Sequence, residues 1–211
     1  MRAAAMMLAS MIMVLPAGAA GSDAPRNYVI TIDGQEVPID IGQKLTIKAK
    51  DGHAIEVGLK QSEIGTFSGN FVTFQHGKDV SVTSSDIEAG LKQHMMATNT
   101  GTLVLVQEYG DLDPRSLAEL MLTQISKDDV KGGKLSQLPG KRKLASGLSL
   151  DGLTASIAIK KGKRHYTARY EVMTAGTSDH GIVAVTRIDD DLTSKDQQIL
   201  DRFWETLTVK L

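Results

Sequence analysis

Seven cationic side chains gather in two short stretches of the sequence and are the strongest candidates for binding chemistry. They are Lys160, Lys161, Lys163 and Arg164, which surround Gly162, together with Lys141, Arg142 and Lys143. Alternating apolar residues on both sides of Gly162 predict a β-hairpin that carries the first four cations at its tip. Together the seven cations would form a positive patch for an anionic partner, such as a phosphorylated lipid or an acidic protein surface. The other interpretation is solubility, because lysines discourage the association of sheet edges.

Local motifs do not indicate a nucleophilic enzyme. The nearest approach to Gly-x-Ser-x-Gly is Gly147-Leu148-Ser149-Leu150-Asp151, in which aspartate replaces the glycine that the sharp turn requires. The sequence has no Walker loop and no dinucleotide-binding fingerprint, so we predict neither an enzyme nor a cofactor. A Ser–His pair brought within hydrogen-bond reach by the fold would restore the hydrolase interpretation.

The residue types that bind metals are scattered along the chain. The five histidines are His53, His76, His94, His165 and His180. No two of them have the i, i+4 spacing of a helix or the i, i+2 spacing of a strand, so we predict no metal site, although convergence in space stays open. The acidic run Asp189, Asp190 and Asp191 lacks the spacing of an EF-hand. It indicates a solvated loop whose charge favours the N-terminus of the following helix.

Composition narrows the range of partners. The 211 residues include 24 lysines and arginines against 25 aspartates and glutamates, and aromatic residues make up 4%. A nucleic-acid-binding protein would normally be basic and would offer aromatic rings to the bases, so we exclude nucleic acid as a partner. The sequence has no cysteine and therefore no disulfide, which a chain of this size does not need to sustain a core.

The beginning of the chain predicts export. Met1 and Arg2 form a basic start, an apolar run follows, and Ala17 and Ala19 place small residues where signal peptidase requires them. We expect a signal peptide over 1–19, cleavage near Ala19, a flexible leader over residues 20 to 26, and a mature protein in the periplasm or secreted. An uncleaved membrane anchor is the alternative. After this segment, no apolar run is long enough to cross a membrane.

Period-two alternation predicts short strands through the first half of the mature chain. The segments are "YVITI", "EVPIDI", "KLTIKA", "HAIEVGLK", "NFVTFQHG" and "DVSV". Gly34, Gly42 and Gly52 are turn signals between the first four segments. Pro38 has no N–H to donate, so its strand is expected at a sheet edge or a bulge.

Three helices are predicted from capping residues and from the spacing of apolar side chains. The first begins at Ser85, the second begins at Asp113-Pro114 and ends at Gly132-Gly133, and the third begins at Ser194. The side chains expected to face the core are Ile87, Leu91 and Met95 in the first helix, Leu117, Leu120, Met121 and Ile125 in the second, and Ile199, Phe203, Trp204 and Leu207 in the third.

The remaining segments complete an α+β pattern. "GTLVLVQEY" is a buried strand, and "KRKLAS", "LTASIAIK", "RHYTARYEVM" and "GIVAVTRI" form an antiparallel meander joined at Gly152, Gly162 and "AGTSDHG". We therefore predict an antiparallel sheet with helices packed on it, in one domain over 27–211. Its first part, over 27–100, is a β-rich meander.

The second half of the chain, over 101–211, resembles the PsbP-like superfamily, which includes the photosystem II extrinsic subunit and the periplasmic DcrB-type proteins. The resemblance rests on the helix "PRSLAELMLTQISKD", the strand "DGLTASIAI", the ladder "HYTARYEVM" with "HGIVAVTRI", and the closing helix "SKDQQILDRFWETLTV". It implies a non-enzymatic accessory role and transfers no site residues. We therefore expect an envelope protein that docks on a protein or surface. The alternative is a small-ligand-binding protein with a pocket between sheet and helices, and an unrecognised hydrolase is the third interpretation.

Overall fold

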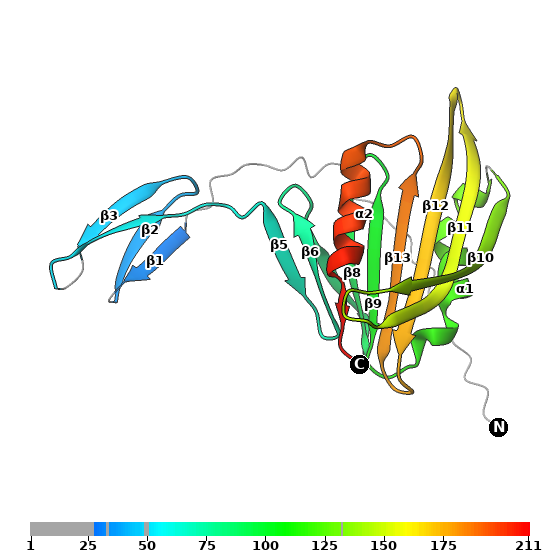
Figure 1. Cartoon of the computed structure of the whole chain (residues 1–211), viewed down its shortest axis with the longest axis horizontal. Helices are drawn as coiled ribbons and strands as arrows, with labels where there is room; N and C mark the ends of the chain where they lie inside the picture. Colours follow the sequence, from blue (N-terminus) through cyan, green and yellow to red (C-terminus); the bar gives the residue numbers. More distant parts are fainter. Residues whose placement is uncertain (1–27, 33, 49–50, 132) are drawn as a thin grey trace. The chain divides into compact units, whose positions relative to one another are not determined.

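The computed structural model describes residues 28–32, 34–48, 51–131 and 133–211 (Figure 1). The predicted signal peptide and leader lie outside the described residues. Contacts divide the chain after Gln61 into an N-terminal unit and a C-terminal unit, Ser62–Leu211. The sequence predicts one domain with a change of character near residue 100, whereas the contacts place the division at residue 61.

The N-terminal unit contains two β-hairpins. Strand β1 (Tyr28–Ile32) pairs with β2 (Gln35–Ile39), and β3 (Lys44–Lys48) pairs with β4 (Ala54–Gly58). These are the four strands that alternation predicts. Gly34, Gly42 and Gly52 have φ angles of 80°, 86° and 86°, a conformation that glycine adopts without steric cost. Pro38 lies in a two-stranded sheet, so its predicted edge position is confirmed.

The C-terminal unit is built around a seven-stranded sheet in the order β10-β11-β12-β13-β9-β8-β7. Its strands are β7 (Thr83–Glu88), β8 (Leu91–Ala97), β9 (Leu103–Tyr109), β10 (Leu135–Lys143), β11 (Ser149–Lys161), β12 (Arg164–Gly176) and β13 (Gly181–Asp189). A smaller sheet contains β5 (Ile64–Ser68), β6 (Val72–Gly77) and β14 (Thr208–Val209). All of these pairings are antiparallel, which confirms the α+β class with an antiparallel sheet.

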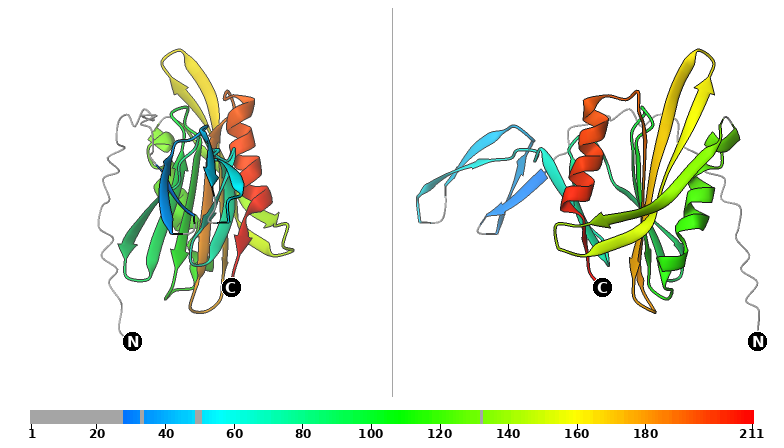
Figure 2. Two further views of the ribbon diagram at one scale, coloured as in Figure 1. Left: turned by 90° about the vertical axis from the view of Figure 1, so that its left-hand side faces the viewer. Right: turned by 45° about the vertical axis from the view of Figure 1, so that its right-hand side comes forward.

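Two α-helices cover opposite faces of the large sheet (Figure 2). Helix α1 (Ala118–Ser126) packs on β11 and β12, and helix α2 (Ser194–Thr206) packs on β6 and β13. Short 3₁₀ turns flank α1 at Pro114–Ser116 and Asp129–Lys131. None of the helices in the described part of the chain is long and apolar enough to cross a membrane.

Each face of the sheet has its own core. The α2-face core includes Phe74, Val104, Val106, Leu150, Met173, Phe203, Trp204 and Leu207. The α1-face core includes Leu105, Met121, Leu122, Ile157, Tyr170 and Val185. The predicted burial of Phe203, Trp204 and Leu207 is confirmed. Leu120 is 43% exposed, so its predicted inward position is wrong, and Leu122 fills the core in its place.

The helix predicted to begin at Ser85 is wrong, because these residues form the hairpin of β7 and β8. Gly90 makes the turn with a φ angle of 77°. The apolar residues Leu91 and Met95 are four positions apart. A spacing of four places two side chains on the same side of a strand as well as on one side of a helix, so the pattern does not distinguish the two.

Other sequence-based predictions are wrong in detail at turns and at helix ends. Gly152 lies inside β11 rather than in a turn, and a Cβ atom there would approach Val172 O to 1.9 Å. The segment "DVSV" precedes β7 without being a strand. Helix α1 ends at Ser126, earlier than predicted. The N-cap of α2 is Thr193, one residue before the predicted Ser194.

Candidate functional site

The two cationic stretches lie at opposite ends of β11. The predicted hairpin is confirmed, with Gly162 at a φ angle of 63° in its turn. Lys141 is opposite Asp151 near the start of β11, whereas Lys161 ends this strand. A strand rises about 3.3 Å per residue, so about ten residues separate the two groups by about 33 Å along the strand. The cations therefore do not meet in one patch.

Three of the candidate cations are paired with carboxylates. Arg164 donates to Asp191 at 2.7 Å and to Asp189 at 3.2 Å. Arg142 donates two hydrogen bonds to Glu171, at 2.8 and 2.7 Å. Lys141 approaches Asp151 to 3.2 Å. Among the described residues, ion pairs within 4 Å do not involve Lys143, Lys160 or Lys163, the other candidates whose side chains are described.

The acidic run is only in part the solvated loop that the sequence predicts: Asp190 and Asp191 are exposed, whereas Asp189 ends β13 and is buried. Asp189 is 3% exposed, and burial raises its pKa although Arg187 and Arg164 oppose the rise. Asp190 accepts a hydrogen bond from the backbone N–H of Thr167 at 2.7 Å, which lowers the pKa of its carboxyl. The run fastens the end of β13 to β12 and to the hairpin rather than only favouring a helix terminus.

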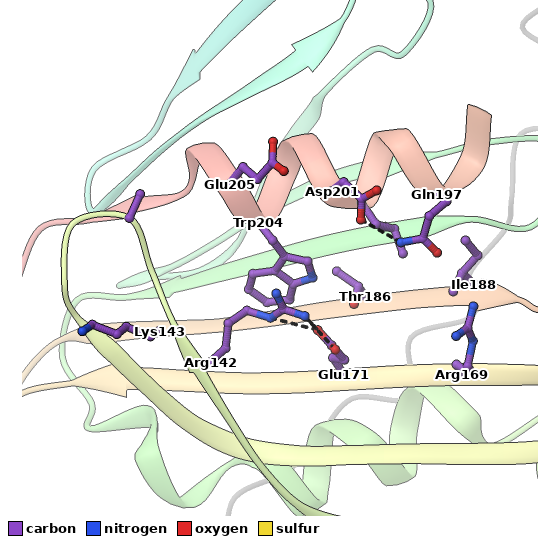
Figure 3. Close-up of a pocket in the computed structure, with 12 residues that line it drawn as sticks. Arg142, Lys143, Arg169, Glu171, Thr186, Ile188, Gln197, Asp201, Trp204 and Glu205 are labelled. Atoms are coloured by element: carbon purple, nitrogen blue, oxygen red, sulfur yellow. Dashed lines mark hydrogen bonds and ion pairs between the residues drawn. The ribbon is translucent and has the colours of Figure 1, made fainter. Parts of the chain in front are cut away.

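A groove lies beside α2 on the open part of the sheet (Figure 3). Its volume is about 450 Å³. The lining residues come from three places: Arg142, Lys143 and Ala145 at the end of β10, Arg169, Glu171, Thr186 and Ile188 on β12 and β13, and Gln197, Leu200, Asp201, Trp204 and Glu205 on α2. Of the seven candidate cations, Arg142 and Lys143 therefore line the groove.

Strand alternation and helix periodicity explain this lining. On β12, Arg169 and Glu171 face the groove, whereas Tyr170 between them is buried in the core of the opposite face. The sheet register places Ile188 opposite Arg169 and Thr186 opposite Glu171. The α2 residues follow one another at intervals of three and one, which places them along one side of a helix.

An arginine stacked on a tryptophan occupies the middle of the groove. The guanidinium carbon of Arg142 lies 4.5 Å from the centroid of the Trp204 ring. Glu171 forms an ion pair with the same guanidinium. The side chains of Arg142 and Glu171 are each about a third exposed. Arginine can make both contacts at once because its planar group stacks through its face and donates through its edge. This arrangement fixes the indole and the guanidinium in one orientation.

Cations and carboxylates occupy different sides of the groove. Lys143 and Arg169 belong to the sheet side, and Asp201 and Glu205 belong to α2 (Figure 3). Asp201 accepts a hydrogen bond from Gln197 Nε2 at 2.8 Å. Ion pairs within 4 Å among the described residues include none of these four charged groups. The groove thus presents charges of both signs that remain available to a ligand.

A serine, a histidine and a glutamate form a second polar array on β7, β8 and β9. Ser84 Oγ lies 2.9 Å from His94 Nδ1, and His94 Nε2 lies 3.0 Å from Glu108 Oε2. Ser84 is exposed, whereas His94 and Glu108 are 4% and 1% exposed. This array was not predictable from the sequence, because its three members are neighbours only across paired strands and because residues of β7 and β8 were predicted as one helix.

Glu108 also fastens the small sheet to the large one. Its carboxylate accepts hydrogen bonds from the backbone N–H groups of Asn70, Phe71 and Val72, at 3.0, 2.6 and 3.0 Å. A Cβ atom at the neighbouring Gly69 would lie 2.6 Å from the carboxylate, so glycine is what allows the turn to approach. The buried carboxylate is therefore satisfied by its surroundings, as burial of a charge requires.

The other histidines remain apart. His53 pairs with Asp51, His76 contacts Gly77 O, and His180 lies beside Asp179. Groups of three or more histidine, cysteine, aspartate or glutamate side chains suited to a metal ion do not occur in the described ranges.

Neither a family model nor a curated protein matches the chain. The fold and the groove define the class of protein only as an α+β protein with a groove of about 450 Å³ between an antiparallel sheet and a helix.

Proposed function

We propose that the chain is an exported, non-enzymatic binding protein of the bacterial envelope and that the groove beside α2 is its binding site. The observation that carries the proposal is the cavity of about 450 Å³, in which one aromatic ring and several polar groups converge. Ligand sites in proteins typically measure about 300–1,000 Å³ and combine an aromatic or apolar lining with a few placed polar groups.

The groove favours a small ligand over docking on an anionic surface. Surface docking needs the cations in one patch, whereas the two stretches lie at opposite ends of β11 and three of the cations are paired. Export rests on the signal-peptide pattern of the sequence. The PsbP-like assignment is part of the proposal, and the antiparallel sheet with a helix on each face is consistent with it.

The single tryptophan provides a direct test, because Trp204 lines the groove. The intrinsic fluorescence of the mature protein would be recorded while the low-molecular-mass fraction of a periplasmic extract is added. We expect a saturable change in emission. Ala145→Phe should abolish it by filling the groove, whereas Ser146→Phe, at the adjacent exposed position outside the lining, should leave it intact. An identical response from the two variants would contradict the proposal.

A specific observation favours a second candidate, a serine hydrolase that uses Ser84, His94 and Glu108. The distances suit proton transfer from a serine hydroxyl to a histidine oriented by a carboxylate. However, three backbone N–H groups already stabilise the Glu108 carboxylate. It therefore has less capacity to stabilise the imidazolium that catalysis would create. We regard the array as a structural clamp.

The two roles make opposite predictions for a fluorophosphonate probe, which labels activated serines. As a clamp, the array should leave Ser84 unlabelled in the folded protein at neutral pH, as judged by peptide mass spectrometry. Labelling at Ser84 that disappears in His94→Gln, with the variant still folded by circular dichroism, would establish the hydrolase instead.

A further inference from the structure

The two walls of the groove carry opposite charges. Arg142, Lys143 and Arg169 line it from the sheet side, and Glu171 neutralises Arg142 through two hydrogen bonds. The helix side contributes Asp201 and Glu205 and no cation. After the internal pair is removed, Arg169 on the sheet side and Asp201 on the helix side remain as opposite charges in the groove, whereas Lys143 and Glu205 direct their charged groups away from it (Figure 3).

Three of the four apolar side chains in the lining are largely covered, and Ala145 is exposed. Ile188, Leu200 and Trp204 are 7%, 5% and 7% exposed. Arg142 lies over the indole and covers part of it. A ligand in the groove would therefore meet mainly charged and polar groups. This favours a small polar molecule over a lipid tail or another large apolar group, since apolar affinity scales with the apolar area removed from water.

We infer that the ligand is a zwitterion of amino-acid to short-peptide size, with its carboxylate toward Arg169 and its ammonium toward Asp201. The inference rests on the proposed function of the groove. An anion without a cationic group would face the acidic helix wall, and a cation without an anionic group would face the basic sheet wall. Only a molecule with both charges is attracted by both walls, because complementary charges select a partner and like charges reject others.

The probe is the dipeptide Ala-Ala, compared with two derivatives that each lack one charge. N-acetyl-Ala-Ala keeps the carboxylate, and Ala-Ala amide keeps the ammonium. Titrations followed by Trp204 fluorescence and by calorimetry should show the zwitterion binding about tenfold more tightly than either derivative, which corresponds to about 1.4 kcal/mol.

Variants assign each charge to a wall. In Arg169→Gln, Ala-Ala and its amide should bind alike, because the partner of the carboxylate is gone, while the advantage over the acetylated form persists. In Asp201→Asn the reverse is expected. Arg202→Gln is the matched control, because Arg202 lies on α2 outside the lining and should leave all three affinities unchanged.

The outcomes separate this inference from the function on which it rests. Equal affinities for the three peptides, with binding blocked by Ala145→Phe, would overturn the zwitterion and leave the groove as a binding site. Absence of peptide binding, while the extract still changes the fluorescence, would overturn the zwitterion in the same way. Absence of any response to peptides or extract would overturn both.

Discussion

At the scale of single residues, Phe203 anchors α2 to the small sheet. Its side chain is 0% exposed, its ring meets Phe74 edge-on with centroids 5.1 Å apart, and the Trp204 ring lies 4.8 Å away. Aromatic pairs in this geometry add to the energy of burial. Phe203 therefore joins the small sheet to the helix that forms one wall of the groove.

Truncation of Phe203 tests this role. Phe203→Ala should lower the free energy of unfolding by about 3–5 kcal/mol, because it removes a buried ring and leaves a cavity that the rigid sheets cannot fill. Urea denaturation followed by circular dichroism would measure the change. A loss below about 1 kcal/mol would mean that the residue does not fill the core.

The residues that the sequence predicted correctly are those whose position follows from local periodicity. Phe203 and Leu207 recur on one side of a helix, so their burial was predictable. Glu108 was not predictable as a buried carboxylate, because its donors at Asn70 to Val72 are distant in sequence. Arg142 was predicted as a cation for docking, and its contacts with Trp204 and Glu171 appear only when β10 reaches α2.

At the scale of elements, a cluster of hydroxyl groups fastens the β8–β9 connection to the start of α2. Asp196 is 4% exposed and accepts hydrogen bonds from Thr100, Thr102 and Thr193 at 2.6, 2.8 and 2.8 Å. Burial raises the pKa of the Asp196 carboxyl, but the hydroxyl donors outweigh it, and the net pKa is lowered. The ionised form therefore stabilises the folded state.

This pKa shift predicts how stability depends on pH. A carboxyl with a lowered folded pKa contributes its full stabilisation above its unfolded pKa of about 3.9, and the contribution is lost as pH falls through the folded pKa. Asp196→Asn should therefore cost about 2 kcal/mol at pH 7, the range of hydrogen bonds to charged groups. The difference between the two proteins should shrink below about pH 4. A difference independent of pH would show that the charge is not involved.

Strands were predicted correctly where alternation and glycine turns agree. They were missed where the spacing of apolar residues fits both a helix and a strand. Alternation and glycine turns located β1 to β4 and β11 to β13, whereas the predicted strand "KRKLAS" overlaps only the end of β10. In β7 and β8 the apolar residues recur every four positions, a spacing that fits a helix as well as a strand, and these residues were therefore predicted as helix. That error concealed the Ser84–His94–Glu108 array. The groove could not be predicted, because it depends on which strands remain uncovered by α2.

At the scale of the whole molecule, both cores belong to the C-terminal unit, Ser62–Leu211. We therefore expect this unit to fold without the N-terminal hairpins. A protein of residues 62–211 should melt within about 4 °C of the mature chain, the shift that about 1 kcal/mol produces in a domain of this size. Circular dichroism of both proteins would measure it. Failure of the shorter protein to fold would support the single cooperative domain that the sequence predicts.

The central claim is that the groove beside α2 is the binding site. It is tested most directly by ¹H–¹⁵N correlation spectra of the mature protein, recorded with and without the low-molecular-mass periplasmic fraction. We expect the shift changes to concentrate on the Trp204 indole, Arg169, Glu171 and Gln197, and we expect Ala145→Phe to remove them. Changes confined to the hairpin tip at Lys160 and Lys163, or to residues around Ser84, would contradict the central claim.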